Sequence, residues 1–100
     1  MDTPSQNDLH VTPLHSAAAS GNIEIAGLLL ENGANANSRQ QGGFTPLHSA
    51  AQNGQVEMAL LLLEHDADVK AVNEAGASAL ELAETNGRSE MVELLKSRGG

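Results

Sequence analysis

The sequence predicts an all-α fold, an α-solenoid in which helix-turn-helix repeats stack side by side with an extended connection between successive repeats. Three observations support this prediction. The segment Thr12–Ala18 returns unchanged later in the chain as Thr45–Ala51. Leu, Ala, Ile, Val and Met supply the apolar volume, because the 100 residues include one Phe and no Trp or Tyr, and such side chains suit packed helices better than sheets. Thr-Pro pairs and glycines stand where short helices would begin and end.

The internal similarity extends beyond this motif. Over Thr12–Asn35, 15 of 24 positions are identical to those of Thr45–Asp68, and a second step of the same length reaches a weaker copy that begins at Ser78. Similarity at a fixed period is the sequence signature of a repeat array. We therefore expect one domain over residues 7–100, with repeats at about 7–39, 40–72 and 73–100, after a disordered segment at residues 1–6.

Each repeat is expected to start with a short helix. Thr12 and Thr45 are suitable N-caps, and each is followed by a proline, which lacks the N–H group that the first helical position does not need. In the third copy, Ser78 and Glu81 form a capping-box pattern. A glycine about two turns later is expected to end each of these helices, namely Gly21, Gly54 and Gly87.

A second helix is expected in each repeat, over about 23–32, 56–65 and 89–98. Its first turn contains a glutamate, which suits the helix dipole. In the first copy this helix is apolar on several sides, so we expect neighbouring repeats to bury it on several sides, including Ile25, Leu28 and Leu29. Leu62, in the middle of the central repeat, is expected to lie in the core.

The third copy reads as a terminal repeat with a polar outer face. Compared with the first two copies, four apolar or small positions become Glu84, Ser89, Glu93 and Lys96. The expected inward set is Leu80, Ala83, Met91, Val92, Leu94 and Leu95, and we expect the array to end here. The first copy shows no such change, so its outer side is either partly shielded by Leu9 and Val11 or open to dimerisation or docking.

At a period of about 33 residues, Thr-Pro-Leu-His followed by Ala-Ala, a glycine, a Leu-Leu-Leu run and Gly-Ala-Asn resembles the ankyrin repeat. The resemblance covers roughly residues 7–98. It implies L-shaped units of antiparallel helices with a hairpin finger between successive units. The sequence departs from the pattern at His10, Gln40 and Asp66, so the pattern does not predict the hairpin details around His10 and Asp66.

Charge and composition exclude several classes of function. The formal charge is −8 and the five basic residues are scattered, so we expect no nucleic-acid binding and no attraction to anionic lipid. There is no Cys, the longest apolar run is Met58–Leu63, and the N-terminus lacks the features of a signal peptide. We expect a soluble, cytoplasmic protein.

No catalytic, cofactor or metal site is expected. The ankyrin resemblance implies that His15 and His48 bond to the preceding Thr hydroxyl and to backbone, tying adjacent hairpins together. His10 and His65 have no ligands at zinc spacing, and no nucleophile elbow or phosphate loop is present. Asn37 matches a position that oxygenases hydroxylate in some ankyrin proteins, but we expect it to brace the hairpin.

The resemblance implies that a partner binds at positions the repeats leave free, on the hairpin tips and the exposed side of each first helix. Phe44, the one aromatic residue, is either an interface anchor or a residue packed against the neighbouring finger. The predicted binding residues are Asp8, Leu9, Val11, Arg39, Gln41, Phe44, Gln52, Asn53, Val72, Glu74, Ala77, Thr85 and Asn86. The residues assigned to the structural motif are Thr12, His15, Thr45, His48, Ser78 and Glu81.

The sequence therefore predicts a protein–protein interaction module, regulatory or scaffolding in role, with a protein partner of unknown identity. The alternative is a structural array that associates with itself through its uncapped first repeat. We expect a monomer, with a weak dimer as the corresponding alternative. Catalysis by a small enzyme is the reading that the residues support least.

Overall fold

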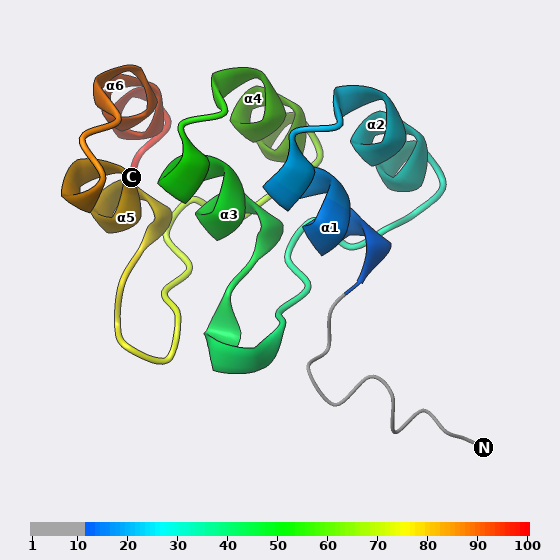
Figure 1. The fold of residues 1–100 in the computed structure, drawn as a ribbon, viewed down its shortest axis with the longest axis horizontal. Coiled ribbons are helices and arrows are strands. Elements are labelled where there is room, and N and C mark those ends of the chain that lie inside the picture. The colour runs from blue at the N-terminus through cyan, green and yellow to red at the C-terminus, as the bar shows by residue number, and fades with distance from the viewer. Residues whose placement is uncertain (1–11) are drawn as a thin grey trace.

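Six α-helices arranged as three antiparallel pairs make up the computed structural model, which describes residues 12–100 (Figure 1). The pairs are α1 (Pro13–Ser20) with α2 (Ile23–Glu31), α3 (Pro46–Asn53) with α4 (Val56–Glu64), and α5 (Ala79–Thr85) with α6 (Ser89–Ser97). The first helices of the pairs begin at Pro13, Pro46 and Ala79, which are evenly spaced along the chain. The predicted all-α repeat stack is confirmed.

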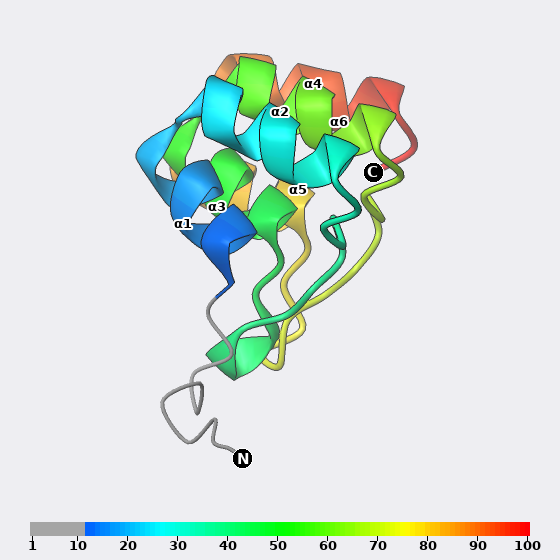
Figure 2. The ribbon, with the colours of Figure 1, turned by 90° about the vertical axis from the view of Figure 1, so that its right-hand side faces the viewer.

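The helices form two layers, with α1, α3 and α5 in one and α2, α4 and α6 in the other (Figures 1 and 2). Helix α3 packs between α1 and α5, and α4 packs between α2 and α6. The connections between pairs leave the helices as long fingers that extend to one side. The stack is elongated as a result, with extents of 43 × 29 × 20 Å.

The helix ends follow from their capping residues. The hydroxyl oxygens of Thr12 and Thr45 accept hydrogen bonds from the third backbone N–H of their helices, and Gly21 and Gly54 end those helices in the left-handed conformation, with φ of 76° and 70°. Helices α2, α4 and α6 are one residue shorter than predicted. Their expected last residues are instead the C-caps Asn32, His65 and Arg98, because these residues leave the helical φ/ψ region.

The core runs through the centre of the stack between the two layers. Its largest fully buried side chains include Leu14, Leu47, Met58, Leu62, Met91 and Leu95. Leu62 is 0% exposed, as expected for a leucine of the central repeat. Burial of each repeat's second helix thus depends on the adjacent repeat, which makes the array quasi-one-dimensional in its stability.

The prediction that α2 is buried on several sides was wrong for Ile25 and Leu28. Ile25 is 48% exposed and Leu28 is 60% exposed. The residues equivalent to Ile25, Met58 and Met91, are 0% exposed because a preceding repeat covers them. Ile25 has no such neighbour within the described chain, whereas Leu28 lies on the side of α2 that no other helix covers.

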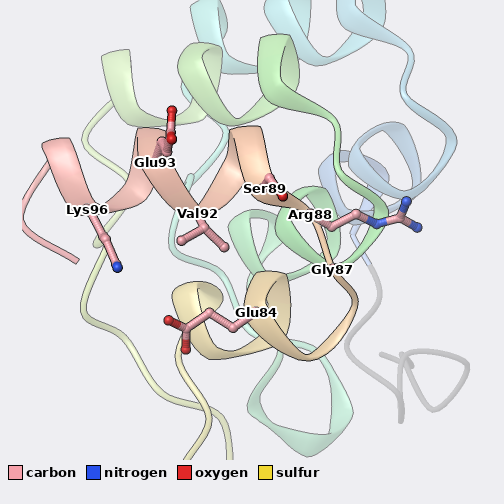
Figure 3. A pocket seen from close by; sticks show the side chains of 7 residues that line it. All are labelled: Glu84, Gly87, Arg88, Ser89, Val92, Glu93 and Lys96. Carbon is pink, nitrogen blue, oxygen red and sulfur yellow. The ribbon is translucent and has the colours of Figure 1, made fainter.

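The four polar replacements of the third repeat lie together at the end of the stack. Glu84, Ser89, Glu93 and Lys96 are all exposed, and all line one hollow of about 390 Å³ between α5 and α6 (Figure 3). Val92, from the predicted inward set, packs against the core but is half-buried, because one side of it lines this hollow. Leu80 and Leu94, from the same set, are also half-buried against the core, whereas Ala83, Met91 and Leu95 are fully buried.

No helix within residues 12–100 combines the length and apolar character that a membrane span requires. The same range contains no group of three or more His, Asp or Glu side chains placed to hold a metal ion.

Candidate protein-binding surface

Two fingers connect the repeats, finger 1 over residues 34–44 and finger 2 over residues 67–77. Both are loops rather than regular hairpins: finger 1 contains the 3₁₀ turn η2 (Gln41–Gly43), and one isolated antiparallel bridge joins Val72 to Ser78 near finger 2. The fingers contact each other, since the backbone N–H of Glu74 donates to the carbonyl of Gly42 over 2.9 Å. They therefore form a continuous edge and not two separate arms.

Gly43 makes this contact sterically possible. Its φ is +79°, and a Cβ atom there would lie 3.0 Å from the backbone nitrogen of Glu74. Both the left-handed conformation and the close approach of finger 2 require a residue without a side chain. A glycine at this position thus sets the spacing of the two fingers.

Arg39 forms hydrogen bonds to both fingers, which was not predicted. Its guanidinium donates to the carbonyl of Gly43 over 2.9 Å and to the carbonyl of Val72 over 2.7 Å, so it links finger 1 to finger 2. Its role as a partner-binding residue stays a prediction, but its charged group already has two protein acceptors. No feature of the sequence indicated this bond, because it depends on how the two loops lie in space.

His15 and His48 make matching sets of hydrogen bonds in the first and second repeats. The Nδ1 atom of His48 accepts from the backbone N–H of Thr45 over 3.0 Å, and its Nε2 atom lies 3.0 Å from the carbonyl of Ala77. His15 makes the equivalent bonds to Thr12 and to the carbonyl of Phe44. Because Nδ1 is an acceptor, Nε2 must carry the proton and donate, so both rings are neutral.

Burial lowers the pKa of both His15 and His48 below the ordinary value of 6.5, and for His48 the charge of Arg39 lowers it further. Hydrogen bonds from the rings to backbone carbonyls oppose this shift without reversing it. Protonation would also turn Nδ1 into a donor facing the N–H of the Thr. The hydrogen bonds of the two histidines thus tie each ring to its capping Thr and to the following finger.

A pH dependence of stability follows from these lowered pKa values. Below pH 6.5 the unfolded chain binds protons that the folded chain excludes, so the histidine contribution to stability is complete above pH 6.5 and is lost as the pH falls. We expect the urea midpoint to fall between about pH 7.5 and pH 5.5. In His48→Gln, the urea midpoint should depend less on pH. NMR titration of the ring protons of His15 and His48 gives the direct check, and a pKa at or above 6.5 in the folded protein would contradict the expectation.

Asn37 braces the base of finger 1. Its side-chain amide donates to the carbonyl of Asp66 over 2.9 Å, and its Oδ1 atom accepts from the N–H of Asp68 over 2.6 Å. Asp66 has a φ of 71° and so takes the left-handed conformation that Gly33 takes one repeat earlier. These two hydrogen bonds account for the bracing role expected of Asn37.

The predicted binding residues of the described chain lie in two places. Arg39, Phe44, Val72, Glu74 and Ala77 belong to the fingers, and Gln41 opens the turn η2. Gln52, Asn53, Thr85 and Asn86 lie at the exposed ends of α3 and α5, where Asn86 is the C-cap of α5. Asp8, Leu9 and Val11 lie outside the described residues.

One hollow brings the two places together. A cavity of about 270 Å³ is lined on one side by Ala75, Gly76 and Ala77 of finger 2. Glu81, Leu82 and Thr85 of α5 form its other side. Ala77 and Thr85 were predicted as binding residues, whereas Glu81 was assigned only to the capping box and Leu82 to none. Their spacing from Thr85 by one helical turn is the signal that would have placed them on the same face.

Phe44 stands half-buried at the end of finger 1. Its ring packs edge-on against the ring of His48, with centroids 5.8 Å apart and planes at 78°. This contact supports a packing role, since such aromatic pairs contribute about 0.5–1.5 kcal/mol.

Comparison with known proteins agrees with the geometry. A family model described as ankyrin repeats in three copies matches residues 1–73 and, in an overlapping match, residues 38–100. A segment of 28 residues is 71% identical to part of the E3 ubiquitin-protein ligase XBAT33 of Arabidopsis thaliana. This match covers 28% of the present chain and only 6% of that protein.

Proposed function

Because the chain belongs to the ankyrin-repeat family, we propose that it binds a partner protein through its finger tips and concave face, in a regulatory or scaffolding role. Ankyrin repeats are in general protein–protein interaction modules, and the family is typically non-enzymatic. The observation that carries the proposal is the cavity shared by finger 2 and α5. A side chain from a partner would contact both parts of the repeat there. The cytoplasmic location expected from the sequence stays a prediction.

Affinity capture tests this proposal. The wild-type chain serves as bait beside Ala75→Arg, which places a long side chain at the exposed rim of the cavity. Ser97→Arg is the matched control, because it adds the same charge to an exposed position on α6. We expect a partner that the wild type and Ser97→Arg retain and Ala75→Arg loses. Equal capture by all three chains would reject the cavity as the binding site.

Phe44→Ala provides a second measurement on the same partner. We expect the substitution to weaken binding by roughly tenfold or more, because buried aromatic anchors dominate many interfaces. The free energy of unfolding should fall by no more than about 1.5 kcal/mol, which is the upper value of the contact with His48. Isothermal titration calorimetry and urea unfolding separate the two effects. A large loss of stability with unchanged affinity would instead place Phe44 in the core.

A second candidate function is self-association through the first repeat. The exposure of Ile25, compared with the complete burial of Met58 and Met91 at the equivalent positions, favours it. Sedimentation equilibrium over a wide concentration range tests this candidate. A strictly monomeric chain would exclude it, whereas a dimer abolished by Ile25→Ser would support it over partner binding.

A further inference from the structure

A groove between α2 and α4 lies on the outer surface of the second-helix layer, away from the fingers. About 430 Å³ in volume, it is lined by Ile23, Glu24, Gly27, Leu28, Glu31 and Leu61. None of these residues belongs to the surface assigned above to partner binding. The groove is therefore a separate feature of the molecule.

Gly27 is the residue that opens the groove. The equivalent residue of the second repeat is Leu60, and in the third it is Glu93. A Cβ atom at Gly27 would meet nothing within 4 Å, so neighbouring side chains do not fill the space that a leucine takes one repeat later. Glycine also lowers the stability of a helix interior by about 1 kcal/mol relative to alanine.

The floor and rim of the groove are apolar and exposed. Leu28 is 60% exposed and Ile23 is 37% exposed. In the described part of the chain, three of the four exposed large hydrophobic side chains lie on α2, the third being Ile25. Exposed apolar side chains gathered around a hollow are typical of a contact surface for another protein.

Carboxylates border this apolar surface at both ends. Glu24 and Glu31 line the groove and are exposed, and their seven-residue spacing on a helix corresponds to about 10.5 Å. Helix α4 repeats the arrangement with Glu57 and Glu64, and neither helix contains a Lys or Arg. The charge that would complement this surface is therefore positive.

A second copy of the chain does not supply that charge. The net charge of −8 makes two copies repel each other, and the hollow at the end of the stack that contains Lys96 is also lined by Glu84 and Glu93. An apolar groove between two helices accepts the apolar face of another helix, at an axial distance of about 8–10 Å. The occupant that fits both shape and charge is a basic amphipathic helix of another protein.

We propose that the groove over Gly27 binds such a helix. Two apolar side chains, at positions i+3 and i+4 of the partner, enter the groove between Ile23, Leu28 and Leu61. Lys or Arg at positions i and i+7 of the partner, which are also about 10.5 Å apart, lie opposite Glu24 and Glu31. The protein thus has a second docking surface, opposite to its fingers.

Fluorescence anisotropy with a synthetic probe tests this site directly. The probe is a labelled, alanine-based peptide with Lys, Leu-Leu and Lys at these spacings, held helical by a lactam staple on its opposite face. We expect saturable binding at low salt. A second peptide with Glu in place of both Lys should not bind. At about 1 mM, even a weak complex with a binding free energy of about −4 kcal/mol forms. If no saturable binding is seen up to that concentration, the proposal is wrong.

Gly27→Leu tests the shape of the site without changing charge. We expect it to weaken binding of the Lys peptide by roughly tenfold or more, while the melting temperature stays unchanged or rises, because the added side chain has open space and leucine favours the helix. Unchanged affinity in this variant would reject the groove. So would a loss of peptide binding in Phe44→Ala with none in Gly27→Leu, since that result places the peptide on the fingers.

Two double variants test the attraction between the groove carboxylates and the lysines of the peptide, and one of them is a matched control. Glu24→Gln with Glu31→Gln should weaken binding of the Lys peptide about fivefold, as expected for two exposed ion pairs. Glu74→Gln with Glu84→Gln removes the same net charge from exposed positions outside the groove and should change affinity less than twofold. Equal losses in the two double variants would mean non-specific attraction and overturn the proposal. A wild-type dimer that Gly27→Leu makes monomeric would assign the groove to a second copy instead.

Discussion

Replacing Leu62 by alanine is expected to lower the free energy of unfolding by about 2–5 kcal/mol. The side chain is 0% exposed and lies in α4, between α2 and α6, so the neighbouring repeats have no means of collapsing into the space without moving a helix. A domain of this size has a total stability of about 5–15 kcal/mol. The substitution therefore removes a large share of what holds the central repeat in place.

Urea and thermal unfolding followed by circular dichroism measure this effect. Leu28→Ala is the matched control, because it removes the same atoms from an exposed position of α2. We expect the free energy of unfolding of that variant to differ from that of the wild type by no more than about 0.5 kcal/mol. If Leu62→Ala had an unaltered melting curve, the stacking of α4 between two neighbours would be wrong, and the candidate binding surfaces would lose their support.

The sequence predicted those parts of the fold that depend on residues close together in the chain. Thr45 with Pro46 and Gly54 defines a short helix almost to the residue, and Ser78 with Glu81 forms the capping box that its spacing indicated. Because the sequence repeats at a constant period, the helix predicted in one repeat is also predicted at the equivalent position of the next. Comparison of equivalent positions also located the polar outer face of the third repeat.

Features that depend on contacts between repeats were not predictable in the same way. The apolar pattern of α2 is the same whether or not a neighbour covers Ile25, so the pattern alone overestimated its burial. Arg39 is an ordinary exposed residue in the sequence, yet it bonds to carbonyls of two loops. The cavity between finger 2 and α5 similarly depends on the distance between two separate segments.

The fingers and the groove over Gly27 lie on opposite sides of the helix layers. The first surface is built from loops whose backbone is held by Asn37, Arg39, His15 and His48, so its shape depends on hydrogen bonds. The second is built from two helices and depends on apolar packing. A change in pH that protonates the histidines should therefore affect the fingers more than the groove.

His48→Ala is expected to lower the free energy of unfolding by about 3 kcal/mol, because each buried partner left without a hydrogen bond costs about 1–3 kcal/mol. The N–H and the hydroxyl of Thr45, in a residue that is fully buried, lose their shared acceptor Nδ1. The carbonyl of Ala77 loses one of its two donors and keeps the N–H of Asn73. The edge contact with Phe44 is also lost. Finger 2 should loosen as a consequence, which hydrogen exchange of the Ala77 and Asn73 amides would detect.

His15→Ala is the internal control for this result, since His15 makes the same set of bonds one repeat earlier. Thr12 is only half-buried, so water can replace the lost acceptor, and we expect a smaller loss of about 1–2 kcal/mol. Equal losses in the two variants would mean that burial of the capping Thr does not determine the cost. Unchanged exchange in finger 2 of His48→Ala would show that the ring stabilises only its own helix, and that the bond to Ala77 does not tie the second repeat to the third.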